Sequence, residues 1–128
     1  MAWEERCMSK ANQEVAGNRV VVQFGADTMG HGPAELGRVL IRSFVKTLGT
    51  TGRRPWRAVF VNTGIHLTTE GSDLIEDLRK LEADGLELLS CGTCLDYFEK
   101  KEKLQAGRAS NMQEIVETLT TADLVVRP

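Results

Sequence analysis

No hydrophobic run in the sequence is long enough to cross a membrane. The longest apolar stretches are residues 20–22 and 58–61, against roughly 18 residues for a spanning helix. Neither sign of charge dominates, because 16 Lys and Arg stand against 18 Asp and Glu. No low-complexity segment or fixed-period repeat is present. A fibrous repeat and a disordered chain are therefore excluded, and we expect no membrane and no nucleic acid as partner.

Cysteine is also scarce. The three cysteines are Cys7, Cys91 and Cys94, an odd number with two members in one Cys-x-x-Cys, which is not a disulfide framework. Residues 1–18 are polar and lack the apolar segment of a signal peptide. We expect these residues to form a flexible arm, and the protein to be cytoplasmic with reduced thiols.

The remaining residues, 19–128, are expected to form a single domain in which strands alternate with helices. Short β-branched or apolar segments predict strands at 19–24, 57–61, 86–90 and 124–127, with 104–108 as a further short strand or a loop. Leu36, Leu40, Phe44 and Leu48 recur every four residues and predict the buried stripe of one helix. Ser110 and Gln113 predict a capping box that opens the last helix. This alternation indicates an α/β fold with a parallel sheet covered by helices on both faces.

Ligands of such sheets bind at the carboxyl ends of the strands. Four predicted ends, at residues 25–27, 62–64, 91–94 and 106–111, should therefore share one edge. Cys91 would leave a strand and Cys94 would lie in the first turn of a helix, where unpaired amides and the helix dipole stabilise a thiolate. The sequence predicts a lowered thiol pKa and a nucleophilic cysteine there.

Other interpretations of the Cys-x-x-Cys remain open. The two cysteines could be small buried residues that only pack. A zinc site would need Cys91 and Cys94 to meet His31 and His66, which lie in separate loops. A thioredoxin-like fold is disfavoured because the only proline after the motif is Pro128, although disulfide exchange stays possible. The glycine-rich loop 25–32 lacks the Lys-Ser/Thr of a phosphate-binding loop, so we expect no nucleotide cofactor.

The motifs resemble those of a known family, the DsrE-like domain of YedF-type proteins, which are sulfurtransferase-like and linked to selenium metabolism. The resemblance extends over about residues 20–126. It rests on Cys-Gly-Thr-Cys-Leu-Asp-Tyr-Phe at 91–98, Ala-Gly at 106–107, Ser-Asn-Met at 110–112 and Glu-Ile-Val-Glu at 114–117. Upstream, Gly-His-Gly at 30–32 and Phe-Val-Asn-Thr-Gly at 60–64 agree.

This resemblance implies a DsrE/F-like three-layer α/β/α sandwich with about five mostly parallel strands, and a homo-oligomer. It also implies a cysteine persulfide, with Cys91 aligned best with the reactive cysteine. Our hypothesis is a sulfur or selenium carrier that meets donor and acceptor proteins and needs no cofactor or metal. Cys91 would attack the donor and Cys94 would release the atom or tune the thiolate. The residues expected to bind substrate are Asn62, Gly64, Gly92, Thr93 and Asn111. The alternatives are a non-catalytic oligomeric or regulatory module with structural or metal-binding cysteines, and a thiol–disulfide oxidoreductase.

Overall fold

A computed structural model describes residues 19–128; the expected flexible arm and Cys7 lie outside the described residues. The elements follow one another in the order β1 (Val20–Phe24), α2 (Ala34–Leu48), β2 (Arg57–Phe60), η2 (Asn62–Leu67), α3 (Ile75–Ala83), β3 (Glu87–Cys91), α4 (Gly92–Tyr97), η3 (Lys101–Lys103), β4 (Arg108–Ser110), α5 (Met112–Thr121) and β5 (Leu124–Val126). Within this part of the chain, no helix has the length and apolar character that crossing a bilayer requires.

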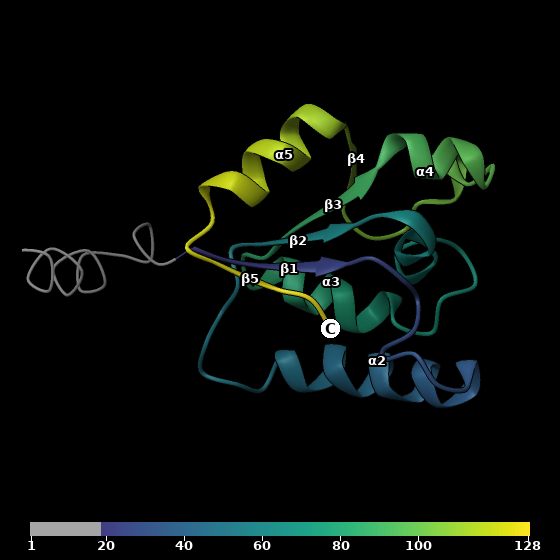
Figure 1. Cartoon of the computed structure of the whole chain (residues 1–128), viewed down its shortest axis with the longest axis horizontal. Helices are drawn as coiled ribbons and strands as arrows, with labels where there is room; N and C mark the ends of the chain where they lie inside the picture. Colours follow the sequence, from purple (N-terminus) through teal and green to yellow (C-terminus); the bar gives the residue numbers. More distant parts are fainter. Residues whose placement is uncertain (1–18) are drawn as a thin grey trace, which may run out of the picture.

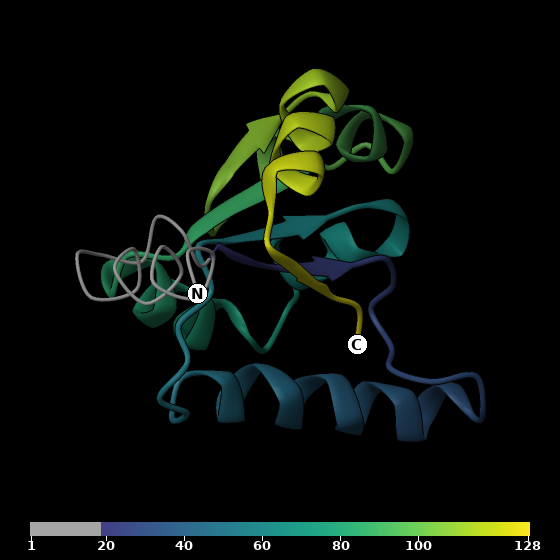
Figure 2. The ribbon, with the colours of Figure 1, turned by 60° about the vertical axis from the view of Figure 1, so that its left-hand side comes forward.

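The five strands form one parallel sheet in the order β4-β3-β2-β1-β5. All strands therefore end at the same edge, as Figure 1 shows by the common direction of the arrows. Helices α2 and α3 lie on one side of the sheet and α5 lies on the other (Figures 1 and 2). The predicted three-layer α/β/α architecture with a five-stranded parallel sheet is confirmed.

Most of the hydrophobic core lies between the sheet and the helices α2 and α3. Phe24 and Phe60, on neighbouring strands, stack with ring centroids 4.9 Å apart. Ile41 of α2 and Leu78 of α3 pack against the same cluster, and each of these four side chains is at most 2% exposed. The apolar residues of α3 and its N-cap also face this core: Leu74, Ile75, Leu78 and Leu81 are all buried.

The opposite face of the sheet carries a smaller cluster. Its buried members are Val21, Val59, Cys91 and Ile115, the last of these on α5. Because side chains alternate along a strand, the neighbours of Val21 and Val59 in sequence point to the other face. Cys91 is therefore a member of the core under α5.

The predicted stripe of α2 is right for Phe44 and Leu48, which are half-buried against this core, and wrong for its first two residues. Leu36 and Leu40 are 52% and 40% exposed, whereas the buried residues of this helix are Gly37, Ile41 and Val45. A side chain at position 37 would place its Cβ 2.7 Å from Thr28 Cβ. Glycine at this position lets the helix approach the loop after β1, and that contact decides which row of apolar residues faces the sheet.

One boundary near the predicted site also differs from expectation. The strand expected at 104–108 lies at Arg108–Ser110, where it pairs in parallel with β3. The helix that follows Cys91 begins at Gly92, directly after β3. Consequently the strand carrying Cys91 continues into α4 with no intervening loop.

Candidate thiol site

The Cys-x-x-Cys lies where the sequence predicts it. Cys91 is the last residue of β3, and Cys94 is the third residue of α4. The carboxyl ends of β1 and β2 lie at the same edge of the sheet, since all strands are parallel. The segment that follows β2 is η2, which begins at Asn62 and contacts α4.

One amide of η2 points at the Cys94 sulfur. The backbone N–H of Asn62 donates a hydrogen bond to Cys94 Sγ over 3.0 Å. Asn62 has a φ of +53°, in the left-handed region that non-glycine residues seldom occupy. Asparagine tolerates this conformation better than most residues. Asn62, which the sequence predicts as a site residue, therefore contacts Cys94 through its backbone amide and not through its side chain.

A glycine brings η2 close enough for this contact. A Cβ at Gly64 would lie within 2.1 Å of the carbonyl oxygen of Phe24, so only glycine fits at this position. Val61 N–H also donates to that same oxygen, at 3.0 Å. Both contacts fix the start of η2 against the end of β1. Gly64, expected to bind substrate, is buried and has this packing role.

The two thiols differ in accessibility. Cys91 is 2% exposed and packs against Val21, Val59 and Ile115. Cys94 is partly buried and packs against both hydrophobic clusters of the protein. We expected Cys91 to meet the donor first, but in this arrangement Cys94 is the thiol with access to solvent.

The expected lowering of the thiol pKa is not found at Cys94. Burial raises the pKa of the Cys94 thiol, and the Asn62 amide opposes that rise by stabilising the thiolate. Interaction with the neighbouring Cys91 raises the pKa further. Since the ordinary thiol pKa is about 8.5, Cys94 is mostly protonated at neutral pH.

Three of the residues expected to bind substrate remain, and they lie at the starts of two helices. Gly92 and Thr93 are the first two residues of α4, and Thr93 is exposed. Asn111 caps α5: its side-chain oxygen accepts from Glu114 N–H at 2.9 Å. The predicted capping box of Ser110 is wrong, because Ser110 is the last residue of β4.

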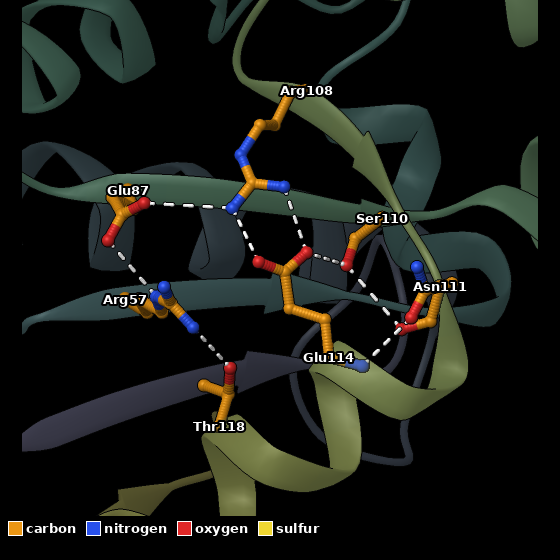
Figure 3. Close-up of polar contacts among 7 residues, drawn as sticks. All are labelled: Arg57, Glu87, Arg108, Ser110, Asn111, Glu114 and Thr118. Carbon is orange, nitrogen blue, oxygen red and sulfur yellow. Dashed lines mark hydrogen bonds and ion pairs between the residues drawn. The ribbon is translucent and has the colours of Figure 1, made fainter.

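A polar cluster fixes α5 over the sheet (Figure 3). Arg108 of β4 holds Glu114 of α5 through two hydrogen bonds of 2.8 and 2.6 Å, and Ser110 Oγ donates to the same carboxylate at 2.6 Å. The Arg108 guanidinium and the Ser110 hydroxyl lower the pKa of Glu114 to about 2. Glu114 is the neighbour of Ile115, which covers Cys91. We call Arg108, Ser110 and Glu114 the clamp, and it holds α5, whose Ile115 is the cover of Cys91, against the sheet.

The clamp continues across the sheet to a second arginine. Arg57 of β2 bonds Glu87 of β3 at 3.1 Å and donates to Thr118 of α5 at 2.8 Å. Glu87 in turn lies 3.7 Å from Arg108. Sequence reasoning missed this cluster. Its signal was a charged residue at the first position of each of the strands β2, β3 and β4.

The zinc alternative is not supported. Among residues 19–128, no group of three or more His, Cys, Asp or Glu side chains is placed to hold a metal ion. His66 instead bonds Lys100, with 2.8 Å between His66 Nδ1 and Lys100 Nζ, and its ring packs against Phe98 at 4.6 Å. His31 is exposed in the loop before α2. The four ligands of the hypothetical zinc site are thus not brought together.

Solved structures show the class of fold. The chain is similar to MTH1491 of Methanobacterium thermoautotrophicum, a protein of unknown function, with a TM-score of 0.62, 22% identity, and coverage of 87% of this chain and 99% of that one. It is also similar to the ychN protein of E. coli, with a TM-score of 0.66, 16% identity, and the same coverage of 87% and 99%. Both have the DsrE/F-like fold, and this chain shares that fold. Neither family profiles nor curated proteins match the sequence.

Proposed function

We propose that this protein carries sulfur, or selenium, as a persulfide-type adduct on its Cys-x-x-Cys. The contact between the Asn62 amide and Cys94 Sγ carries the proposal, because a backbone donor aimed at sulfur stabilises an anionic sulfur atom. The DsrE/F-like fold is consistent with this role. The YedF-type motif around residues 91–98 supports it further.

In the proposed reaction Cys94 is the first acceptor. Its thiolate attacks the outer sulfur of a donor persulfide, a new S–S bond forms on Cys94, and the donor leaves as a thiolate. An acceptor thiolate can then take the outer sulfur by the same exchange. Alternatively, Cys91 attacks the inner sulfur, which forms a Cys91–Cys94 disulfide and releases hydrosulfide, so the two thiols supply the electrons that reduce the sulfane sulfur. The raised pKa of Cys94 favours loading above neutral pH.

Intact-mass measurement tests the proposal. The reduced protein, in a Cys7→Ser background that removes the third thiol, is treated with glutathione persulfide and weighed. We expect a gain of one sulfur atom that is retained in Cys91→Ser and absent in Cys94→Ser. Addition of sulfur to Cys91 alone would contradict the order of the steps. No gain in any variant would reject the carrier function.

A thiol–disulfide oxidoreductase is the second candidate. It is favoured by the direct interaction of the Cys94 thiol with Cys91. This function requires an intramolecular disulfide that exchanges with a protein substrate, so the reduced form should reduce insulin in the presence of glutathione. Persulfide loading without insulin reduction separates the carrier from the oxidoreductase.

Self-association belongs to the same proposal. Leu36, Val39 and Leu40 form an exposed apolar row on α2, with exposed fractions of 52%, 48% and 40%. Such a row favours contact with another protein surface. Size-exclusion chromatography coupled to light scattering should give a molar mass above the 14.2 kDa of one chain. The double variant Leu36→Lys/Leu40→Lys should have a lower molar mass than the wild type in the same measurement. A monomeric wild type would argue against this part of the proposal.

A further inference from the structure

A cleft of about 400 Å³ is lined in part by η2, which also contacts Cys94, and contains neither cysteine of the Cys-x-x-Cys. Its walls come from α2, from the end of η2 and from the segment 70–74. Three of its lining residues, Ile41, Leu67 and Leu74, are buried and apolar. The volume lies within the range of small-molecule sites, which combine apolar walls with a few polar groups.

One wall of the cleft carries a cation that has no anionic partner within residues 19–128. Lys100 is partly buried, and its ammonium group donates to His66 Nδ1 at 2.8 Å. Burial and the charge of Lys100 lower the pKa of His66, so the imidazole is neutral at pH 7. Among residues 19–128, no carboxylate lies within 4.0 Å of the Lys100 ammonium. A partly desolvated ammonium group paired only with a neutral ring favours an incoming anion.

The same cleft carries an anion that has no cationic partner among the residues that the structure describes. Asp27 is partly buried, and its charge acts on His66, where it opposes the fall in pKa. Its backbone N–H donates to Thr63 Oγ1 at 3.3 Å. Within the described part of the chain, the Asp27 carboxylate forms no ion pair. Asp27 and Lys100 therefore present opposite charges to one space without neutralising each other.

The other charges of the lining limit the class of ligand. Arg42 and Asp73 pair with each other at 2.8 Å, and the remaining charged residues, Glu35, Arg38 and Glu70, are exposed. Four carboxylates and three cations line the cleft. A bare anion would meet an excess of negative charge there, whereas a dipolar molecule can satisfy Lys100 and Asp27 together.

We propose that this cleft binds a small zwitterionic amino acid, with its carboxylate on Lys100, its ammonium group on Asp27 and its apolar side chain against Val39, Ile41 and Leu67. The proposal does not depend on the carrier function, because both cysteines lie outside the cleft.

Calorimetric titration of the full chain with L-leucine tests this site. The matched probes are isocaproate, which lacks the amine, and isopentylamine, which lacks the carboxylate. We expect leucine to bind, and each probe to bind at least about tenfold more weakly, since each loses one charged hydrogen-bonding group. Lys100→Gln and Asp27→Asn should each weaken leucine binding by about the same factor.

Two further variants serve as controls. Lys103→Gln removes a nearby exposed lysine that does not line the cleft and should leave leucine binding unchanged. Lys100→Arg keeps the positive charge and should retain most of the binding. The thermal midpoint of each variant confirms that it is folded. The proposal is overturned if leucine gives no binding at millimolar concentration, if isocaproate binds as tightly as leucine, or if the two charge-removing variants bind leucine like the wild type.

Discussion

The two faces of the sheet are stabilised in different ways. The face under α2 and α3 is an extended apolar core with the stacked pair Phe24 and Phe60 near its centre. The face under α5 buries few hydrophobic residues, and charged groups of β2, β3 and β4 extend toward the helix there (Figure 3). Cys91 belongs to this second face.

This difference separates the parts of the molecule that stabilise the fold from those that control the thiols. Burial of large apolar side chains provides most of the folding free energy. Hydrogen-bonded ion pairs that are partly exposed add less, and they respond to pH and salt. The cover of Cys91 is therefore the part of the structure that can open at the lower cost.

The largest expected effect comes from removing one core side chain on each face. Phe24→Ala should lower the free energy of unfolding by about 3–5 kcal/mol and Ile115→Ala by about 2–4 kcal/mol. Only Ile115→Ala should also speed alkylation of Cys91, which it uncovers. Urea denaturation and mass-resolved alkylation in a Cys7→Ser background measure both quantities. Val116→Ala, at a 48% exposed position on the same helix, is the control, and an equal alkylation rate in all three variants would show that α5 does not protect Cys91.

A moderate effect is expected when the clamp is broken. The pKa of Glu114 is about 2 in the folded protein, below its ordinary value of 4.5. Its stabilising contribution is therefore complete above about pH 4.5 and is lost as the pH falls toward 2. Glu114→Gln should cost about 1 kcal/mol at pH 7, and the difference from the wild type should shrink between pH 4.5 and pH 2.

Denaturation curves at several pH values measure this change. Glu117→Gln alters an exposed carboxylate of the same helix and should give no such pH dependence. If Glu114→Gln and Glu117→Gln follow the same curve, the clamp makes no measurable contribution.

The smallest expected effect concerns the conformation of Asn62. Glycine adopts its φ of +53° without strain, whereas a β-branched residue does not. Asn62→Gly should therefore keep the hydrogen bond from the backbone amide of residue 62 to Cys94 Sγ. Asn62→Val should lose this hydrogen bond, which would raise the pKa of Cys94 further. Loss of one such hydrogen bond should slow alkylation roughly twofold to tenfold near neutral pH.

The pH profile of Cys94 alkylation, measured in a Cys7→Ser/Cys91→Ser background, separates the two Asn62 variants. Identical profiles would mean that the backbone contact does not influence the thiol.

Local pattern was enough to predict β1, β2, β3 and β5, the parallel sheet and the position of both cysteines at a strand-to-helix junction. It was not enough for α2, which carries apolar residues in more than one row, so that the contact of Gly37 with Thr28 selects the buried one. The hydrogen bond from the Asn62 amide to Cys94 Sγ joins residues 32 positions apart in the sequence, so no short-range sequence pattern could predict it. β4 has only three residues, two of them exposed, so it has no hydrophobic signature.

The two edge strands of the sheet limit how copies of this protein can aggregate. β4 and β5 have three residues each, and β4 carries the guanidinium of Arg108. An intruding strand would gain few backbone hydrogen bonds at either border and would meet a charge at one of them. Fibril-like growth through strand addition is thereby discouraged, which leaves helix surfaces as the route for controlled assembly.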